Sequence, residues 1–112
     1  MGPEKLTQYK SLIRRYLADW VSYHPSEKSG IPLTIVEDAN QGHFLLLEVG
    51  TGNQGWVYQL YVHLQLTTDA RVTLLKNNTL EDPLAELIER GVNRADCSIA
   101  ELPVNNLELS TS

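Results

Sequence analysis

Three glycines in the segment Glu48–Gln59 have a spacing that could bind phosphate. Gly50, Gly52 and Gly55 match G-x-G-x-x-G, in which backbone N–H groups at a helix start bind the pyrophosphate of a dinucleotide. That chemistry requires a strand before the glycines and a helix after them. Residues 56–67 alternate like a strand instead. The sequence therefore predicts a hairpin loop here, not a nucleotide site.

A second candidate is His63, which lies within the same alternating segment. An imidazole can act as acid, base or ligand contact near neutral pH. Alternation predicts that His63 shares a face with Tyr61 and Gln59. With a concave pocket around them, these three side chains would form a small ligand-binding or enzymatic site. The alternative, which we prefer, is a histidine packed and hydrogen-bonded within the sheet.

The other reactive side chains indicate no catalytic centre. Cys97 is the one cysteine, which excludes an internal disulfide. Next to Asp96 its thiol would have a raised pKa, so we expect a packed residue and not a nucleophile. The histidines His24, His43 and His63 lack the H-x-x-x-H spacing of a zinc site. We therefore expect no catalytic residues, no metal and no cofactor.

Lys10, Arg14 and Arg15 form a basic patch near the N-terminus. Such a patch could bind an acidic protein or a phosphate backbone, although a solvated helix face is the simpler interpretation. The net charge is -5. Residues 31–112 contain four Lys and Arg against eleven Asp and Glu, which is poorly suited to neutralising many phosphates. Direct nucleic-acid binding is therefore disfavoured.

Hydrophobic periodicity predicts the elements that must position these residues. Apolar residues at spacings of one, three and four indicate a helix over residues 4–23, before a loop that contains Pro25 and Pro32. Alternating or apolar stretches bounded by turn residues then indicate four strands. The predicted strands are residues 31–36, 43–49, 56–67 and 71–76.

The strand over residues 56–67 has the cleanest alternation. It predicts one apolar face and one mixed face, as expected for an antiparallel strand with a core on one side. The apolar face would contain Trp56, Tyr58, Leu60, Val62, Leu64 and Leu66. The mixed face would contain Val57, Gln59, Tyr61, His63, Gln65 and Thr67.

A second helix is predicted near residues 80–91, with Thr79 and Asp82 resembling a capping box and Gly91 as its end. A short C-terminal strand follows. Because the loops between strands are short, consecutive strands must form hairpins. The predicted fold class is α+β: an N-terminal helix, an antiparallel β-sheet of about four to five strands, and helices over its apolar face.

Length and composition predict a single domain over residues 1–112, with a core at about 4–103 and a loose tail at 104–112. We find neither a signal peptide nor an apolar run long enough to span a membrane, and we expect a cytoplasmic protein. One sheet with two helices would leave a face partly uncovered, so we also expect a homodimer.

Several segments, taken together, resemble the XisI family. They are "LLLEVG", "VYQLYVHLQL", "DARVTLLKNNT" and "LAELIERGVNRADCSI", with Tyr9 in the N-terminal helix. The resemblance covers about residues 5–103. His63 matches the family's strand histidine, and Thr79 matches the threonine before its helix. Thr51 stands where the family has Trp, so the chain resembles a diverged member.

The resemblance implies a regulatory function. XisI proteins are cyanobacterial excision controlling factors for the fdxN element, which is removed from nitrogen-fixation genes during heterocyst development. The family has no known catalytic residue set, and it works beside the protein XisH and a separate recombinase. We therefore expect a non-enzymatic accessory protein with an XisH-like partner. The candidate contact residues are His63, Tyr61, Gln59, Lys10, Arg14 and Arg15.

Overall fold

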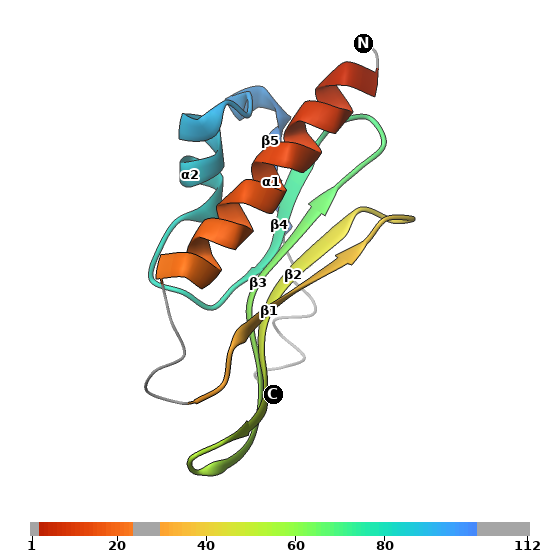
Figure 1. Ribbon diagram of the computed structural model, residues 1–112. Coiled ribbons are helices and arrows are strands. Elements are labelled where there is room, and N and C mark those ends of the chain that lie inside the picture. Colours follow the sequence, from red (N-terminus) through yellow and green to blue (C-terminus); the bar gives the residue numbers. More distant parts are fainter. Residues whose placement is uncertain (1–2, 24–29, 101–112) are drawn as a thin grey trace, which may run out of the picture.

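Two helices pack on one face of a five-stranded sheet (Figure 1). This computed structural model describes residues 3–23 and 30–100. The predicted tail at 104–112 and His24 lie outside these residues. In chain order the elements are α1 (Pro3–Tyr23), β1 (Leu33–Asp38), β2 (His43–Gly52), β3 (Gly55–Leu66), β4 (Val72–Asn77), α2 (Pro83–Arg90), the 3-10 turn η1 (Arg94–Asp96) and β5 (Cys97–Ile99).

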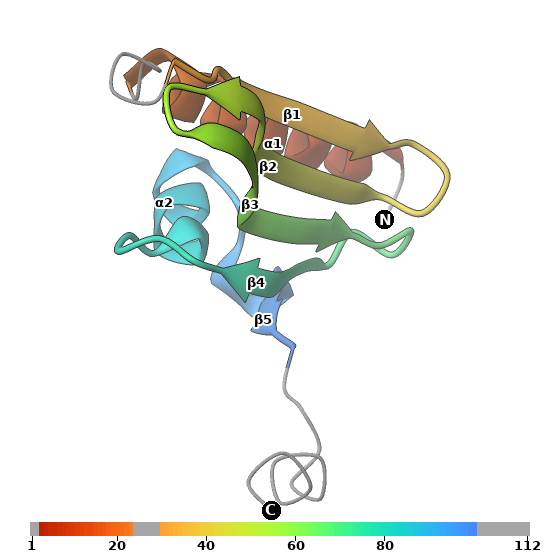
Figure 2. The ribbon, with the colours of Figure 1, turned by 90° about the horizontal axis from the view of Figure 1, so that it is seen from below.

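The strands lie in their chain order, β1-β2-β3-β4-β5 (Figure 2). The first four pair antiparallel, and the turn between Gly52 and Gly55 closes the predicted hairpin. The predicted α+β fold is confirmed. Its last strand is parallel to β4, because the chain returns through α2 before it rejoins the sheet. The sheet is therefore mixed.

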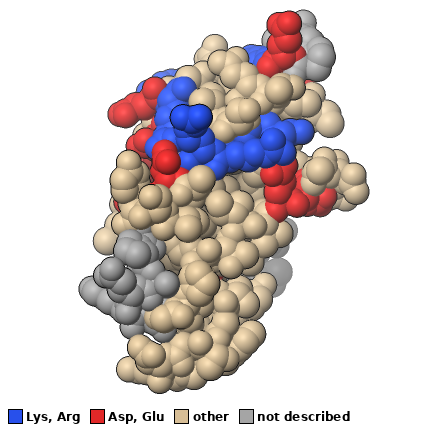
Figure 3. Space-filling view, in the orientation of Figure 1, with Lys and Arg blue, Asp and Glu red and all other residues tan. Residues whose placement is uncertain are grey.

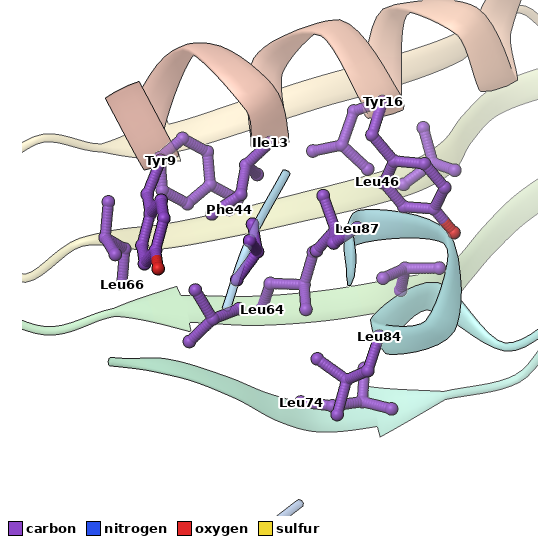
Figure 4. Packing of buried hydrophobic residues seen from close by; sticks show 14 of the residues in the cluster. Tyr9, Ile13, Tyr16, Phe44, Leu46, Leu64, Leu66, Leu74, Leu84 and Leu87 are labelled. Atoms are coloured by element: carbon purple, nitrogen blue, oxygen red, sulfur yellow. The ribbon is translucent and has the colours of Figure 1, made fainter. Parts of the chain in front are cut away.

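The core lies between α1, α2 and the sheet (Figure 4). The predicted stripe of α1 supplies Ile13 and Leu17, which are fully buried. Phe44 of β2 and Leu64 of β3 lie beneath them, and Leu87 of α2 belongs to the same buried cluster. Full burial of an aliphatic side chain of this size contributes about 1.5–3 kcal/mol, so this contact fixes α1 on the sheet.

A β-bulge in β3 reverses the alternation of that strand. Leu46 pairs with Val62, whereas the next residue, Leu47, pairs with Leu60, so Tyr61 is an extra residue. One extra residue moves everything beyond it to the opposite face. The apolar face predicted for residues 56–66 is therefore wrong: its first half points away from the helices and its second half points toward them.

The side of the sheet turned away from α1 and α2 is called the uncovered face below. The strand register defines its central members, because residues directly opposite each other share a face. They are Val36, His43, Leu45, Leu47, Val49, Trp56, Tyr58, Leu60, His63 and Gln65.

The second helix begins later than its predicted start. Asp82 is the N-cap, and its carboxylate accepts a hydrogen bond from the Ala85 N–H at 3.1 Å. Pro83 then occupies the first turn, where its missing N–H costs nothing. Thr79 instead donates to Asn77 in the preceding turn. Leu80 therefore lies outside the helix and is fully exposed.

A polar cluster joins α1 to the C-terminal end of the fold. The Tyr9 hydroxyl donates to Asp96 Oδ2 at 2.5 Å and accepts from the Asn93 N–H at 3.0 Å. Lys5 Nζ lies 2.6 Å from the same carboxylate oxygen. Lys5 and Tyr9 together lower the pKa of Asp96. The cluster attaches η1, and with it β5, to the first helix.

Replacing Tyr9 with Phe tests this attachment. The ring stays in the core, but the Asn93 N–H and the Asp96 carboxylate lose their shared partner, so we expect a loss of about 1–3 kcal/mol in the free energy of unfolding. Urea denaturation measures it. Tyr23→Phe is the control, since Tyr23 is 75% exposed at the end of α1, and should change stability by less than about 0.5 kcal/mol. Equal effects of the two substitutions would contradict the proposed attachment.

Candidate functional site

Two histidines meet on the uncovered face. His43 Nδ1 lies 2.9 Å from His63 Nε2, and the ring centroids are 5.0 Å apart. A hydrogen bond at this distance requires one proton between the two nitrogens. Gln65 is the third polar neighbour, with its Nε2 3.5 Å from His43 Nε2. The strand register explains the meeting: His43 lies opposite Gln65, and Leu45, two residues further along β2 on the same face, lies opposite His63.

The surroundings disfavour a second charge on this pair. Partial burial lowers the pKa of His63, and the nearby charge of His43 lowers it further. Two charged groups flank the pair by register: Asp38 of β1 opposite His43, and Lys76 of β4 opposite His63. His43 and His63 thus form a hydrogen-bonded pair within the sheet.

Tyr61 and Gln59 do not join His63. The bulge places them on the helix side, where the Tyr61 hydroxyl donates to Glu48 Oε1 at 3.0 Å and its ring lies 6.4 Å from that of Trp20. Burial first, and then Glu48, raise the pKa of Tyr61. The predicted trio is thus split between two faces.

A shallow cavity of about 370 Å³ lies beside Tyr61 on the helix side. Its wall comes from α1, β3 and the loop before α2, and His63 contributes nothing to it. The lining residues are Trp20, Gln59, Tyr61, Asn78, Thr79, Leu80 and Glu81.

The basic patch lies along α1, with Lys10 and Arg14 on the flank next to β1. Figure 3 shows Lys and Arg gathered over the helices with Asp and Glu at their margins, whereas the region of the β2–β3 hairpin in that view carries no charge. Arg14 forms two hydrogen bonds to Glu37, at 2.9 and 2.6 Å. Arg15 is exposed, and Lys10 lines a cavity of about 370 Å³ between α1 and the turn at Gly42.

The largest departure from the sequence-based prediction is a pair of exposed aromatic side chains. Trp56 and Tyr58 are 69% and 70% exposed on the uncovered face. The alternation from Trp56 to Leu66 predicted both in the core. The sequence carries no signal for the single extra residue at Tyr61, so the exposure of these rings follows from the register alone.

Cys97 has the surroundings of a packed residue. Cys97 is half-buried, and burial first, then Asp96, raise the pKa of its thiol. Within residues 3–23 and 30–100, three or more His, Cys, Asp or Glu side chains nowhere gather in a way that would hold a metal ion. Neither α1 nor any other helix in this part of the chain has the length and apolar character needed to cross a membrane.

The histidine pair makes stability depend on pH. The folded state lowers the pKa of His63 below its ordinary value of about 6.5. At any pH above that ordinary value, His63 is neutral in both states and does not destabilise the fold. Stability decreases as pH falls from that value through the folded pKa. We expect the free energy of unfolding to rise with pH across this window, and His63→Gln to flatten the rise.

Nuclear magnetic resonance titration provides the direct measurement. In His43→Gln the His63 pKa should rise, but it should stay below the ordinary value because burial remains. A His63 pKa at or above about 6.5 in the unmodified protein would contradict this description of the site.

The family model described as XisI protein matches residues 3–107. A crystal structure of an XisI-like protein from Anabaena variabilis superposes with a TM-score of 0.72 and 24% identity, covering 83% of this chain and 84% of that chain. No curated protein sequence gives a significant match.

A second crystal structure is described as fdxN element excision controlling factor XisI from Anabaena variabilis. It superposes with a TM-score of 0.69 and 18% identity, covering 90% of this chain and 97% of that chain. These two likenesses concern the fold. The family match extends from the start of α1 to beyond β5, and the chain therefore belongs to the XisI family.

Proposed function

We propose that the protein is a non-enzymatic accessory factor that controls programmed excision of a DNA element during heterocyst development. It acts in the cytoplasm by binding a protein partner, an XisH-like protein. The observation that carries this proposal is the family match over residues 3–107. One solved relative of the same fold is described as an excision controlling factor, which supports the same role here.

The basic patch along α1 is the surface that we assign to this partner. On a chain of net charge -5, the cations gathered over the helices form a local field of opposite sign (Figure 3). Such a field attracts and orients an acidic protein surface. Lys10 and Arg15 form no salt bridge within the part of the chain that the structure describes. The charge of Lys10 acts on Glu37 from a greater distance, and both side chains can contact a partner.

Direct binding to DNA has weaker support on the same surface. Arg14 is neutralised by Glu37, and Arg90 lies against Asp19 and Glu86. Proteins that bind DNA tightly through phosphates commonly make about six to ten such contacts. Two available cations fall short of that number, whereas a few charge pairs suffice to orient a protein partner.

Co-purification with an XisH-like protein tests the proposal. We expect a complex at micromolar concentrations that weakens as salt is added. The double variant Lys10→Glu, Arg15→Glu should raise the dissociation constant at least about tenfold, because charge pairs at an interface become repulsive. Arg71→Glu, Arg94→Glu is the matched control: it also reverses two charges, at exposed sites beside β4 and β5, and should bind like the unmodified protein.

Two outcomes would reject this assignment. One is the absence of a complex at micromolar concentrations. The other is a gel shift of element DNA by the protein alone, lost with rising salt and with the Lys10 and Arg15 substitutions, which would support direct nucleic-acid binding instead.

A further inference from the structure

The uncovered face has two unlike halves. Near the β1–β2 turn it is polar, with His43, His63 and Gln65, as expected for a sheet face in contact with water. Toward the β2–β3 hairpin it is mainly apolar across three strands, and Thr34 and Thr51 are its uncharged polar members. The residues of this apolar patch are Val36, Leu45, Leu47, Val49, Trp56, Tyr58 and Leu60.

The hairpin is packed on its other side. Ile31 is 1% exposed, and a Cβ atom at Gly50 would lie 3.4 Å from its Cγ2 atom. By register, Val49 lies opposite Tyr58 and next to Gly50, so it points to the other side. Intramolecular packing thus occupies the helix side of the hairpin and leaves the two aromatic rings exposed.

We propose that a second copy of the chain covers the apolar patch, which produces a symmetric dimer with the two uncovered faces in contact. A two-fold interface places the same patch on both partners, and two sheets pack face to face at about 10 Å with their side chains interdigitated. The rings of Trp56 and Tyr58 would fill the centre of that interface, where aromatic residues contribute most.

Charge favours a second copy as the occupant. The apolar patch contains no ionisable carboxylate or cation, and the charges that flank it by register are one Asp38 and one Lys76. Two chains of net charge -5 repel each other, so self-association requires a neutral surface. Interfaces between identical subunits are also the more apolar class.

The apolar patch supplies the centre of an interface and not its whole area. A strand of ten residues, such as β2, is roughly 33 Å long, and three strands span about 14 Å between their outer edges, so the whole uncovered face projects about 460 Å² before the relief of its side chains is counted. The patch takes the half toward the hairpin, and the polar half beside it would form part of the rim of an interface of roughly 800 Å² per partner. Large exposed apolar patches mark interaction sites.

Analytical ultracentrifugation of the whole chain tests the proposal. The unmodified protein should sediment at twice the chain mass of 12.6 kDa. Trp56→Lys should weaken the dimer at least a hundredfold and yield a monomer, with an unchanged circular dichroism spectrum because the side chain is 69% exposed. Leu80→Lys, the same change at an exposed apolar side chain on the helix side, should remain dimeric.

Tryptophan quenching by acrylamide gives a second measurement. Trp20 is 8% exposed and Trp56 is 69% exposed, so quenching reports mainly on Trp56. Dilution through the dissociation constant should increase quenching in the unmodified protein. Protection that does not change with concentration would mean that a segment of the same chain covers the patch, and it would overturn the proposal.

Other results would overturn it as well. A monomer at a concentration of about 100 μM would leave the patch to a different protein, since stable dimers of this size are far tighter. A dimer that survives Trp56→Lys, or one that Leu80→Lys disrupts equally, would place the interface elsewhere. These readouts need no partner protein, so they are independent of the test of the proposed function.

Discussion

The extra residue at Tyr61 in β3 constrains the whole molecule. Beyond Val62 the strand faces the helices with aliphatic side chains, and before Leu60 it turns its aromatic side chains away from them. A regular strand would bury one continuous apolar row and leave the other face polar. With the bulge, Tyr61 contacts Trp20 of α1, and apolar surface appears on both sides of one sheet.

The helix side is held by two different interactions. Apolar burial beneath α1 provides most of the stabilisation, because Ile13 and Leu17 lose all contact with water. Polar contacts then determine where the later elements attach. Tyr9 and Asp96 connect the first helix to the turn before β5 across most of the sequence, and such a contact is strong because the carboxylate is charged.

The two proposed surfaces are compatible with each other. A dimer formed through the uncovered faces keeps both α1 helices on the outside, where Arg15 is exposed. Each copy could then bind one partner, so that a dimer would present two equivalent sites. Two linked sites raise the apparent affinity for a paired or repeated target without any new contact. The histidine pair adjoins the apolar patch through Leu45, which lies opposite His63.

Local patterns in the sequence determined the element types, the hairpin at Gly50 to Gly55 and the family, because periodicity and turn chemistry act over a few neighbouring residues. The helix α2 was predicted as well, although it begins at Pro83 and not near residue 80. The tertiary structure determined which side of the sheet each side chain faces. Whether His63 meets Tyr61 depends on strand register, which the packing of α1 and the pairing with β2 establish over long separations in the chain. A single inserted residue has no local signature, yet it separates those two side chains and leaves Trp56 exposed.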